Sequence, residues 1–163
     1  MSIDNIIKTV LGFGCREVTL TGGEPLAQKH CLNLLTRLCD SGNHVSLETS
    51  GALPIDAVDP RVVRVLDIKT PGSGEMASNR WSNLAFIRNR DVIKFVVCDR
   101  MDFDWCCKLI QQHQLAQRCS IYFSPSANEL QARELAEWIL ADHVPVRLQL
   151  QVHKFLWGNE AGH

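Results

Sequence analysis

The sequence lacks the features that mark secreted, membrane-spanning or nucleic-acid-binding proteins. Its 17 Lys and Arg residues nearly balance 18 Asp and Glu residues, so the formal net charge of −1 gives no electrostatic reason to expect nucleic acid or an anionic membrane as a partner. No apolar run approaches the roughly 20 residues that span a bilayer. The first residues, 1–5, carry no basic segment of the kind that begins a secretory signal. These absences predict a cytoplasmic protein.

The sequence also lacks any cysteine spacing typical of a metal site. Its seven cysteines form no Cys-x-x-Cys or Cys-x-x-x-Cys pair, and the adjacent Cys106 and Cys107 cannot easily chelate one metal together. An odd number without an export signal argues against a disulfide framework. We therefore expect most of the cysteines to be small buried hydrophobic residues.

What is present is an alternation of short apolar runs and amphipathic stretches, with no internal repeat or linker. The length of 163 residues and the hydrophobic content of 45% predict one domain with a substantial core. The alternation predicts an α/β fold with parallel strands. The expected strands are 17–21, 44–48, 62–69, 92–98, 120–123 and 146–152. The expected helices are 26–40, 102–115 and 128–141, and 71–84 is expected to be a loop with a short helix.

Several local patterns refine these predictions. The run 92–97 is rich in β-branched residues, which favours a strand buried on both faces. Helix 26–40 places Leu34, Leu35 and Leu38 on one face and is expected to end at 41–43. In helix 128–141, Asn128 and Gln131 have the spacing of a capping box. The apolar stripe of that helix is Ala132, Leu135, Ala136, Ile139 and Leu140.

This alternation is compatible with an open doubly wound sheet or with a barrel-like curved sheet. In both, functional residues gather at the carboxyl ends of the strands. Polar and glycine-bearing segments do follow the expected strands here, at 21–25, 48–51, 67–74 and 123–126.

The most specific of these segments is Thr21-Gly22-Gly23-Glu24-Pro25. Two glycines let a ligand approach the backbone closely, Glu24 adds an anion suited to an amine, and Pro25 can occupy a first helical turn. One alternative is a tight turn that merely needs glycine. Another is a phosphate site at a helix N-terminus, although Glu24 would repel that anion.

Gly-Gly-Glu-Pro after a β-run resembles the S-adenosylmethionine (SAM) binding motif of radical SAM enzymes. The later segments Glu48-Thr49-Ser50-Gly51, Asp67-Ile68-Lys69, Ser124-Pro125-Ser126 and Gln151-Val152-His153-Lys154 make the set similar to the 7-carboxy-7-deazaguanine synthases. The resemblance runs from about residue 3 to the end of the chain. It implies a partial (β/α) barrel with a curved, mostly parallel sheet and outer helices. Residues 1–163 would form a single radical SAM-like domain, N-terminally incomplete, with the first βα unit missing.

The resemblance also implies roles for individual residues. Thr21 matches a position that contacts the pterin substrate, and no catalytic residue is implied. For Thr21 and Lys69 the alternatives are a strand-end hydroxyl and a solvated lysine. A lone histidine at the end of a strand, such as His153, is more often a structural residue than a ligand or a base. The residues implied to bind SAM are Gly22, Gly23, Glu24, Asp67, Ile68, Lys69, Ser124, Pro125, Ser126 and Ala127.

The implied activity is conversion of 6-carboxy-5,6,7,8-tetrahydropterin to 7-carboxy-7-deazaguanine with loss of ammonia, in queuosine biosynthesis. The implied cofactors are SAM, a 4Fe–4S cluster and Mg²⁺. The implied partners are a flavodoxin-type electron donor and a second copy of the chain in a homodimer.

One part of the family pattern is missing. The family places three cluster-binding cysteines before Gly-Gly-Glu-Pro, whereas only Cys15 precedes it here, in an expected turn at the opposite end of the sheet. The thiolates that a cluster requires and the Thr that binds Mg²⁺ are therefore absent, and no metal ligand is predicted. We interpret Met1 as an internal methionine of a longer synthase. The alternatives are a non-catalytic SAM- or pterin-binding remnant, a subunit completed by a cysteine-bearing chain, and another radical SAM enzyme such as an activase.

Overall fold

The computed structural model describes residues 1–127, 129–152 and 156. Four α-helices and six strands follow one another along this part of the chain, with short 3₁₀ helices in the connections. The helices are α1 (Ile3–Gly12), α2 (Cys31–Asp40), α3 (Arg100–Gln112) and α4 (Ala132–Ala141). The strands are β1 (Glu17–Leu20), β2 (His44–Thr49), β3 (Val63–Ile68), β4 (Val92–Val97), β5 (Ser120–Pro125) and β6 (Arg147–Leu148).

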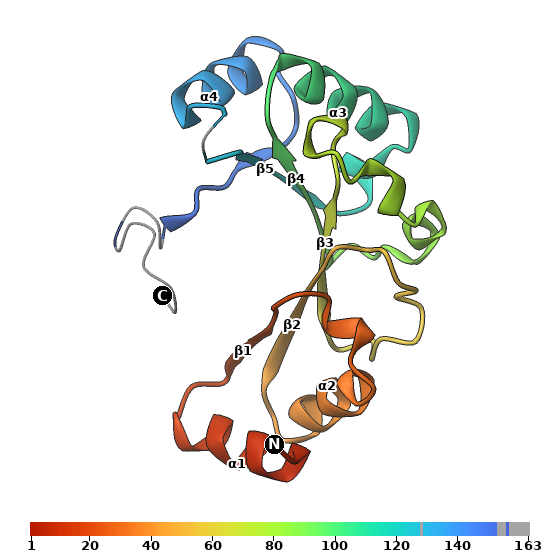
Figure 1. The fold of residues 1–163 in the computed structure, drawn as a ribbon, viewed down its shortest axis with the longest axis vertical. Coiled ribbons are helices and arrows are strands. Elements are labelled where there is room, and N and C mark those ends of the chain that lie inside the picture. The colour runs from red at the N-terminus through yellow and green to blue at the C-terminus, as the bar shows by residue number, and fades with distance from the viewer. Residues whose placement is uncertain (128, 153–155, 157–163) are drawn as a thin grey trace.

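The six strands form one parallel sheet in the order β1-β2-β3-β4-β5-β6. Figure 1 shows this sheet as an open arc, with α2, α3 and α4 along its outer side and none of these helices on its inner, concave side. Strand order never reverses, so the sheet has no switch point of the doubly wound kind. The predicted barrel-like curved sheet is thus confirmed as a partial barrel.

The core lies between the convex face of the sheet and the helices. Each central strand alternates buried and half-buried residues, so that one face packs under the helices and the other lines the concave side. Leu34, Leu35 and Leu38 bury the predicted face of α2. Phe95, Phe103 and Phe123 meet edge to face, with ring centroids 5.6–5.7 Å apart.

A fully buried ion pair joins β3 to the segment before β4. Arg64 and Asp91 are both 0% exposed at their side chains, and the Arg64 guanidinium also donates to the carbonyl of Ile55. Asp91 accepts in addition from the backbone N–H of Arg64, at 3.0 Å, and of Arg88, at 2.8 Å. The pair lies at the amino ends of the strands. Its role is therefore in the fold and not at the carboxyl ends of the strands.

Two predicted helices begin later than expected. The segment 26–40 starts as a 3₁₀ helix, Pro25–Ala27, and α2 begins only at Cys31. The last helix begins at Ala132, with Gln131 in extended backbone and without a side-chain cap, so the predicted start at 128 is wrong. Asn128 itself lies outside the described residues. Leu140, predicted to be on the buried stripe, is 75% exposed.

Strand predictions were closer, with three exceptions. In β4 only Ile93, Phe95 and Val97 are buried, so the run is not buried on both faces. The predicted strand 146–152 is reduced to two residues, and β5 continues to Pro125. The loop 71–84 carries three 3₁₀ helices, Pro71–Ser73, Met76–Ser78 and Trp81–Phe86.

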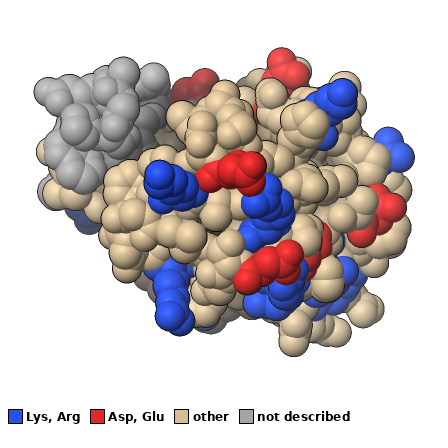
Figure 2. Space-filling view, turned by 90° about the horizontal axis from the view of Figure 1, so that it is seen from below, with Lys and Arg blue, Asp and Glu red and all other residues tan. Residues whose placement is uncertain are grey.

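The described helices and the face shown in Figure 2 bear on possible membrane and charged partners. Over the described residues, no helix has both the length and the apolar character needed to cross a bilayer. On the face shown in Figure 2, Lys and Arg side chains alternate with Asp and Glu. This pattern agrees with the balanced charge of the sequence.

Candidate functional site

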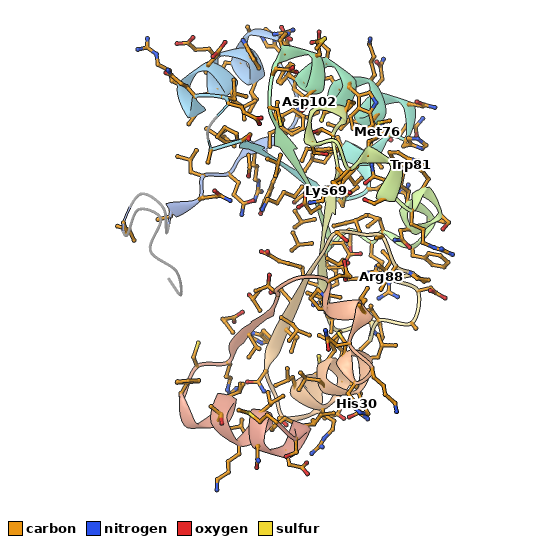
Figure 3. The ribbon with its side chains drawn as sticks, viewed as in Figure 1. His30, Lys69, Met76, Trp81, Arg88 and Asp102 are labelled. Atoms are coloured by element: carbon orange, nitrogen blue, oxygen red, sulfur yellow. The ribbon has the colours of Figure 1, made fainter. Side chains whose placement is uncertain are left out.

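Two adjoining cavities open at the carboxyl ends of the strands. The first, of about 190 Å³, is bordered by the loops after β1, β2 and β3 and by the concave face of β4. The second, of about 280 Å³, lies between the ends of β3, β4 and β5. Asp67 and Lys69 line both cavities, and Figure 3 shows Lys69 near the middle of the arc, at the end of β3.

The loop after β1 presents its backbone to the first cavity. Gly22 has φ of +102° and Gly23 has φ of +47°, and both residues are exposed and line this cavity. A Cβ at either position would meet no atom within 4 Å. Glycine is therefore required by backbone conformation and not by close packing, and the turn is open to a ligand.

Glu24 ties this loop to the end of β2. Its carboxylate accepts from the Thr49 hydroxyl at 2.8 Å, from the Ser50 N–H at 2.9 Å and from the Leu26 N–H at 3.1 Å. Burial alone would raise the pKa of Glu24, but the hydrogen bonds from Ser50, Thr49 and Leu26 outweigh burial and lower it. The loop conformation thus depends on an ionised Glu24, and its contact with a ligand stays a prediction.

Asp67 and Lys69 form an ion pair at the end of β3. The Lys69 ammonium lies 2.8 Å from Asp67 Oδ2, and Asn79 fixes the Lys69 backbone through two hydrogen bonds of 2.9 and 2.8 Å. Asp67 Oδ1 is buried without a hydrogen-bond partner among the described residues. Ile68, between them, is 4% exposed and also reaches the second cavity. A ligand that donates a hydrogen bond would complete the Asp67 carboxylate.

The loop at the end of β5 borders the second cavity through Ser126. Its N–H donates to the Val97 carbonyl at 2.8 Å, and its hydroxyl donates to Glu129 at 2.6 Å. That hydrogen bond is the main cause of the lowered pKa of Glu129. The hydroxyl of Ser124 is buried and unpartnered within the described chain. Pro125 is half-buried and Ala127 exposed, and neither lines a cavity.

Asp102 holds the loop that closes the second cavity. Its carboxylate accepts from the Gly72 N–H at 2.8 Å and from the Cys98 N–H at 3.1 Å. Asp102 is buried on α3 and does not itself line the second cavity; Figure 3 labels its position. Its contribution is to fix the two backbone segments that flank Ser73 and Ser126.

The structure therefore brings most of the predicted site residues to one edge of the sheet. Thr21, Gly22 and Gly23 share the first cavity with Asp67 and Lys69, and Ser126 joins the second. Glu24, Ser124, Pro125 and Ala127 lie in the same loops but line neither cavity. The predicted set omitted five further residues of the first cavity: Glu48, Thr49, Ser50, Val65 and Lys94.

Signals for some of these omitted residues exist in the sequence. Glu48, Thr49 and Ser50 follow an expected strand, which is where functional residues gather. Lys94 is the single charged residue in the run 92–97. Treating this run as a strand with one polar face would have placed Lys94 on that face. The Thr21 hydroxyl is 3.5 Å from Glu48, so these two strand ends are close together.

The described residues do not fit an iron–sulfur cluster. No group of three or more His, Cys, Asp and Glu in the described ranges could hold a metal ion. Cys15 is exposed before β1, at the opposite end of the sheet from the cavities, as predicted. Burial raises the pKa of Cys98 to about 12 and that of Cys119 to about 11, which disfavours the thiolates that would bind iron. Three of the seven cysteines are buried, three are half-buried and Cys15 is exposed, so the prediction that most are buried is met only in part.

A larger apolar cavity lies on the other side of the first loop. It measures about 670 Å³ and is bordered by α1, the end of β1 and α2. Its apolar lining includes Ile3, Ile6, Leu20, Pro25 and Leu34. Among the described strands, β1 is an edge of the sheet, so this cavity adjoins unpaired backbone groups.

The chain is similar to curated proteins of one kind. It is 45% identical to the 7-carboxy-7-deazaguanine synthase of Chlorobaculum tepidum, across 99% of this chain and 74% of that protein. It is 39% identical to the enzyme of the same name from Koribacter versatilis, across 88% of this chain and 70% of that protein. No protein-family model matches the chain.

Two solved structures share the fold. The crystal structure of QueE from Escherichia coli superposes with a TM-score of 0.70 at 22% identity, covering 93% of this chain and 64% of that one. Streptococcus suis SuiB, solved with bound S-adenosylmethionine, superposes with a TM-score of 0.57 at 11% identity, covering 83% of this chain and 38% of that one. At these identities the superpositions support the radical SAM fold alone.

Proposed function

Because the chain belongs to the 7-carboxy-7-deazaguanine synthase family, we propose that it serves the conversion of 6-carboxy-5,6,7,8-tetrahydropterin to 7-carboxy-7-deazaguanine with loss of ammonia. This is a radical SAM lyase reaction on the way to queuosine. The observation that carries the proposal is that the Gly22-Gly23 turn is open and shares one cavity with Asp67 and Lys69. A turn that only reversed the chain would not need to share a cavity with Asp67 and Lys69.

Within the site, we assign SAM to the loops after β1, β3 and β5 and the pterin to the neighbourhood of Thr21. The unpartnered Asp67 Oδ1 and Ser124 Oγ support the assignment, since a polar cofactor would satisfy them. When bound, SAM supplies the adenosyl group for hydrogen abstraction. This chain's own residues bind and orient it through the glycine backbone and the Asp67–Lys69 pair.

The described residues do not fit the cluster, and none of them is assigned to it. We propose that residues 1–163 form one radical SAM-like unit, and that a preceding βα unit brings the cluster cysteines and the Mg²⁺ ligand. The span of 74% and 70% of the two relatives supports this proposal. Reading the genomic DNA upstream tests it. An in-frame segment with Cys-x-x-x-Cys-x-x-Cys supports it, and an immediate stop codon contradicts it.

Three further parts of the proposal follow from the family resemblance. The protein acts in the cytoplasm, takes its electron from a flavodoxin-type donor and forms a homodimer.

Calorimetry with the 163-residue chain tests the binding half of the proposal. We expect SAM to bind, and Gly23→Ala to weaken it about tenfold, because a φ of +47° strains any residue with a Cβ. Gly12→Ala, at the end of α1, is the matched control and should bind SAM like the parent chain. A folded chain that binds no SAM would contradict the assignment of SAM to these loops.

A second candidate function is a non-catalytic protein that binds SAM or a pterin. It is favoured by the lack of a metal-binding group among the described residues. Anaerobic reconstitution with iron and sulfide of the chain joined to the proposed preceding βα unit, followed by an absorption spectrum and a product assay, separates the two. Cluster absorption with product formation supports the enzyme, whereas ligand binding without either supports the binding protein.

A further inference from the structure

A row of polar side chains crosses the concave face of the sheet. Asp67 of β3 pairs in register with Lys94 of β4, Lys94 with Tyr122 of β5, and Tyr122 with Arg147 of β6. Residues paired across neighbouring strands point to the same face, and strands lie about 4.8 Å apart. The row therefore extends over roughly 14 Å, enough for a bicyclic ligand.

The charges of this row are not balanced within the described chain. Asp67 is already paired with Lys69 at 2.8 Å. Lys94 and Arg147 form no ion pair with any described residue, and the side chains of Lys94 and Tyr122 make no hydrogen bond there. Lys94 is half-buried and lines the first cavity. A lysine that leaves bulk water without an anion is costly, so its position favours an anionic ligand.

Unpartnered polar atoms in the row and just beyond it are a second sign of a ligand. Three buried polar atoms have no hydrogen-bond partner in the described chain, and all belong to the ends of the strands that hold the row: Asp67 Oδ1, Ser124 Oγ and Gln149 Oε1. Gln149 is held beside β5 by its N–H, which donates to the Phe123 carbonyl at 2.8 Å. Folded proteins rarely leave such atoms unpaired, so a polar ligand with its own donors fits this wall.

We propose that Lys94, with the Tyr122 hydroxyl beside it, binds the carboxylate of the pterin substrate and so selects the carboxylated pterin. The inference rests on the proposed function and names a specificity residue for the same site. Lys94 lines only the cavity that holds Thr21. Gly22, Gly23, Asp67 and Lys69, which are assigned to SAM, line this cavity as well. The carboxylate of SAM is therefore the competing partner for Lys94, and the affinity of the Lys94 variants for SAM distinguishes the two.

Calorimetry with three ligands tests this role: pterin-6-carboxylate, pterin without the carboxylate, and SAM. We expect the parent chain to prefer the carboxylated pterin at least tenfold, as for one charge-assisted hydrogen bond. Lys94→Met should abolish this preference and leave the affinity for SAM unchanged. Lys94→Arg should retain most of it, and Lys108→Met, which removes an exposed lysine of α3, should change nothing.

Three outcomes would overturn the inference. One is that Lys94→Met keeps the preference, and another is that it loses affinity for SAM instead. The third is that the parent chain binds both pterins equally. If the parent chain binds neither pterin nor SAM, the proposed function itself fails. Thermal unfolding checks that each variant is folded. If Lys94→Met is not, Lys94→Gln and the salt dependence of the parent chain's preference give the same decision, because a charge-based preference must weaken with ionic strength.

Discussion

At the scale of single residues, Glu24 has a structural role in addition to its place in a cofactor-binding motif. Its carboxylate joins the loops after β1 and β2 through hydrogen bonds to residues 25 positions or more away in the sequence. Removing its charge should therefore disturb the glycine turn as well as any ligand contact. The two effects can be separated by measuring stability without ligand.

Glu24→Gln should lower the free energy of unfolding by about 1–3 kcal/mol, because donors from Thr49, Ser50 and Leu26 lose a charged acceptor. The folded-state pKa of Glu24 lies below its ordinary value of 4.5. Its stabilising contribution is therefore complete above about pH 4.5 and is lost as the pH falls through the folded-state pKa. Urea unfolding of both chains between pH 3 and 7 measures this. If the parent chain and the Glu24→Gln chain lost equal stability on acidification, the stabilising role of the Glu24 carboxylate would be contradicted.

Gly51 offers a sharper steric test than the glycines of the open turn. It has φ of +72°, and a Cβ there would lie 2.6 Å from Leu66 Cδ1. Gly51→Ala should cost about 2–5 kcal/mol of stability, from backbone strain and overpacking together. Gly12→Ala, with ordinary φ and no atom within 4 Å, should be neutral or slightly stabilising by denaturant unfolding. Similar losses in both variants would contradict the packing described here.

At the scale of secondary-structure elements, the buried Arg64–Asp91 pair joins the amino ends of β3 and β4. Asp91→Asn should destabilise the fold by about 3–5 kcal/mol, because it leaves the Arg64 guanidinium buried without a counter-charge. Asp4→Asn breaks the exposed pair with Arg37 and should cost less than about 1 kcal/mol. Thermal or urea unfolding compares the two. A mild effect of Asp91→Asn would show that water reaches the pair.

The sequence predicted the presence of the helices and strands better than the residues at which they begin and end. Strands were recognisable because runs such as 63–68 and 92–97 are β-branched and are followed by polar loops. The start of α2 was missed because the segment before it is fixed by Glu24 and its partners on β2, which local helical periodicity does not report. The last strand was overestimated, since only two of its residues pair with β5.

The site was predictable to a similar degree. Loops at strand ends could be named from the motif resemblance, and the structure gathers most of them around two cavities. Lys94 and Gln149 were missed as site residues because their significance depends on register across strands, which is a property of the folded sheet. His153 lies outside the described residues, so its role stays a prediction.

At the scale of the whole molecule, the edge at β1 and the adjoining apolar cavity of about 670 Å³ leave hydrogen-bonding groups and apolar surface uncovered. We expect the 163-residue chain, expressed alone, to form dimers or larger species, or to be poorly soluble. Light scattering coupled to size-exclusion chromatography measures this over a range of concentrations. Thr19→Lys, which places a charge on the exposed edge strand, should reduce association. A cooperative monomer at all concentrations would contradict the prediction.

The strand order has a consequence for how this molecule assembles. Each described strand from β2 to β6 pairs with the strand that precedes it in the chain, so each new pairing closes only the loop between two successive strands. Such short closures cost little entropy. The sheet can therefore lengthen unit by unit as the ribosome releases it, with every finished strand serving as the template on which the next one aligns.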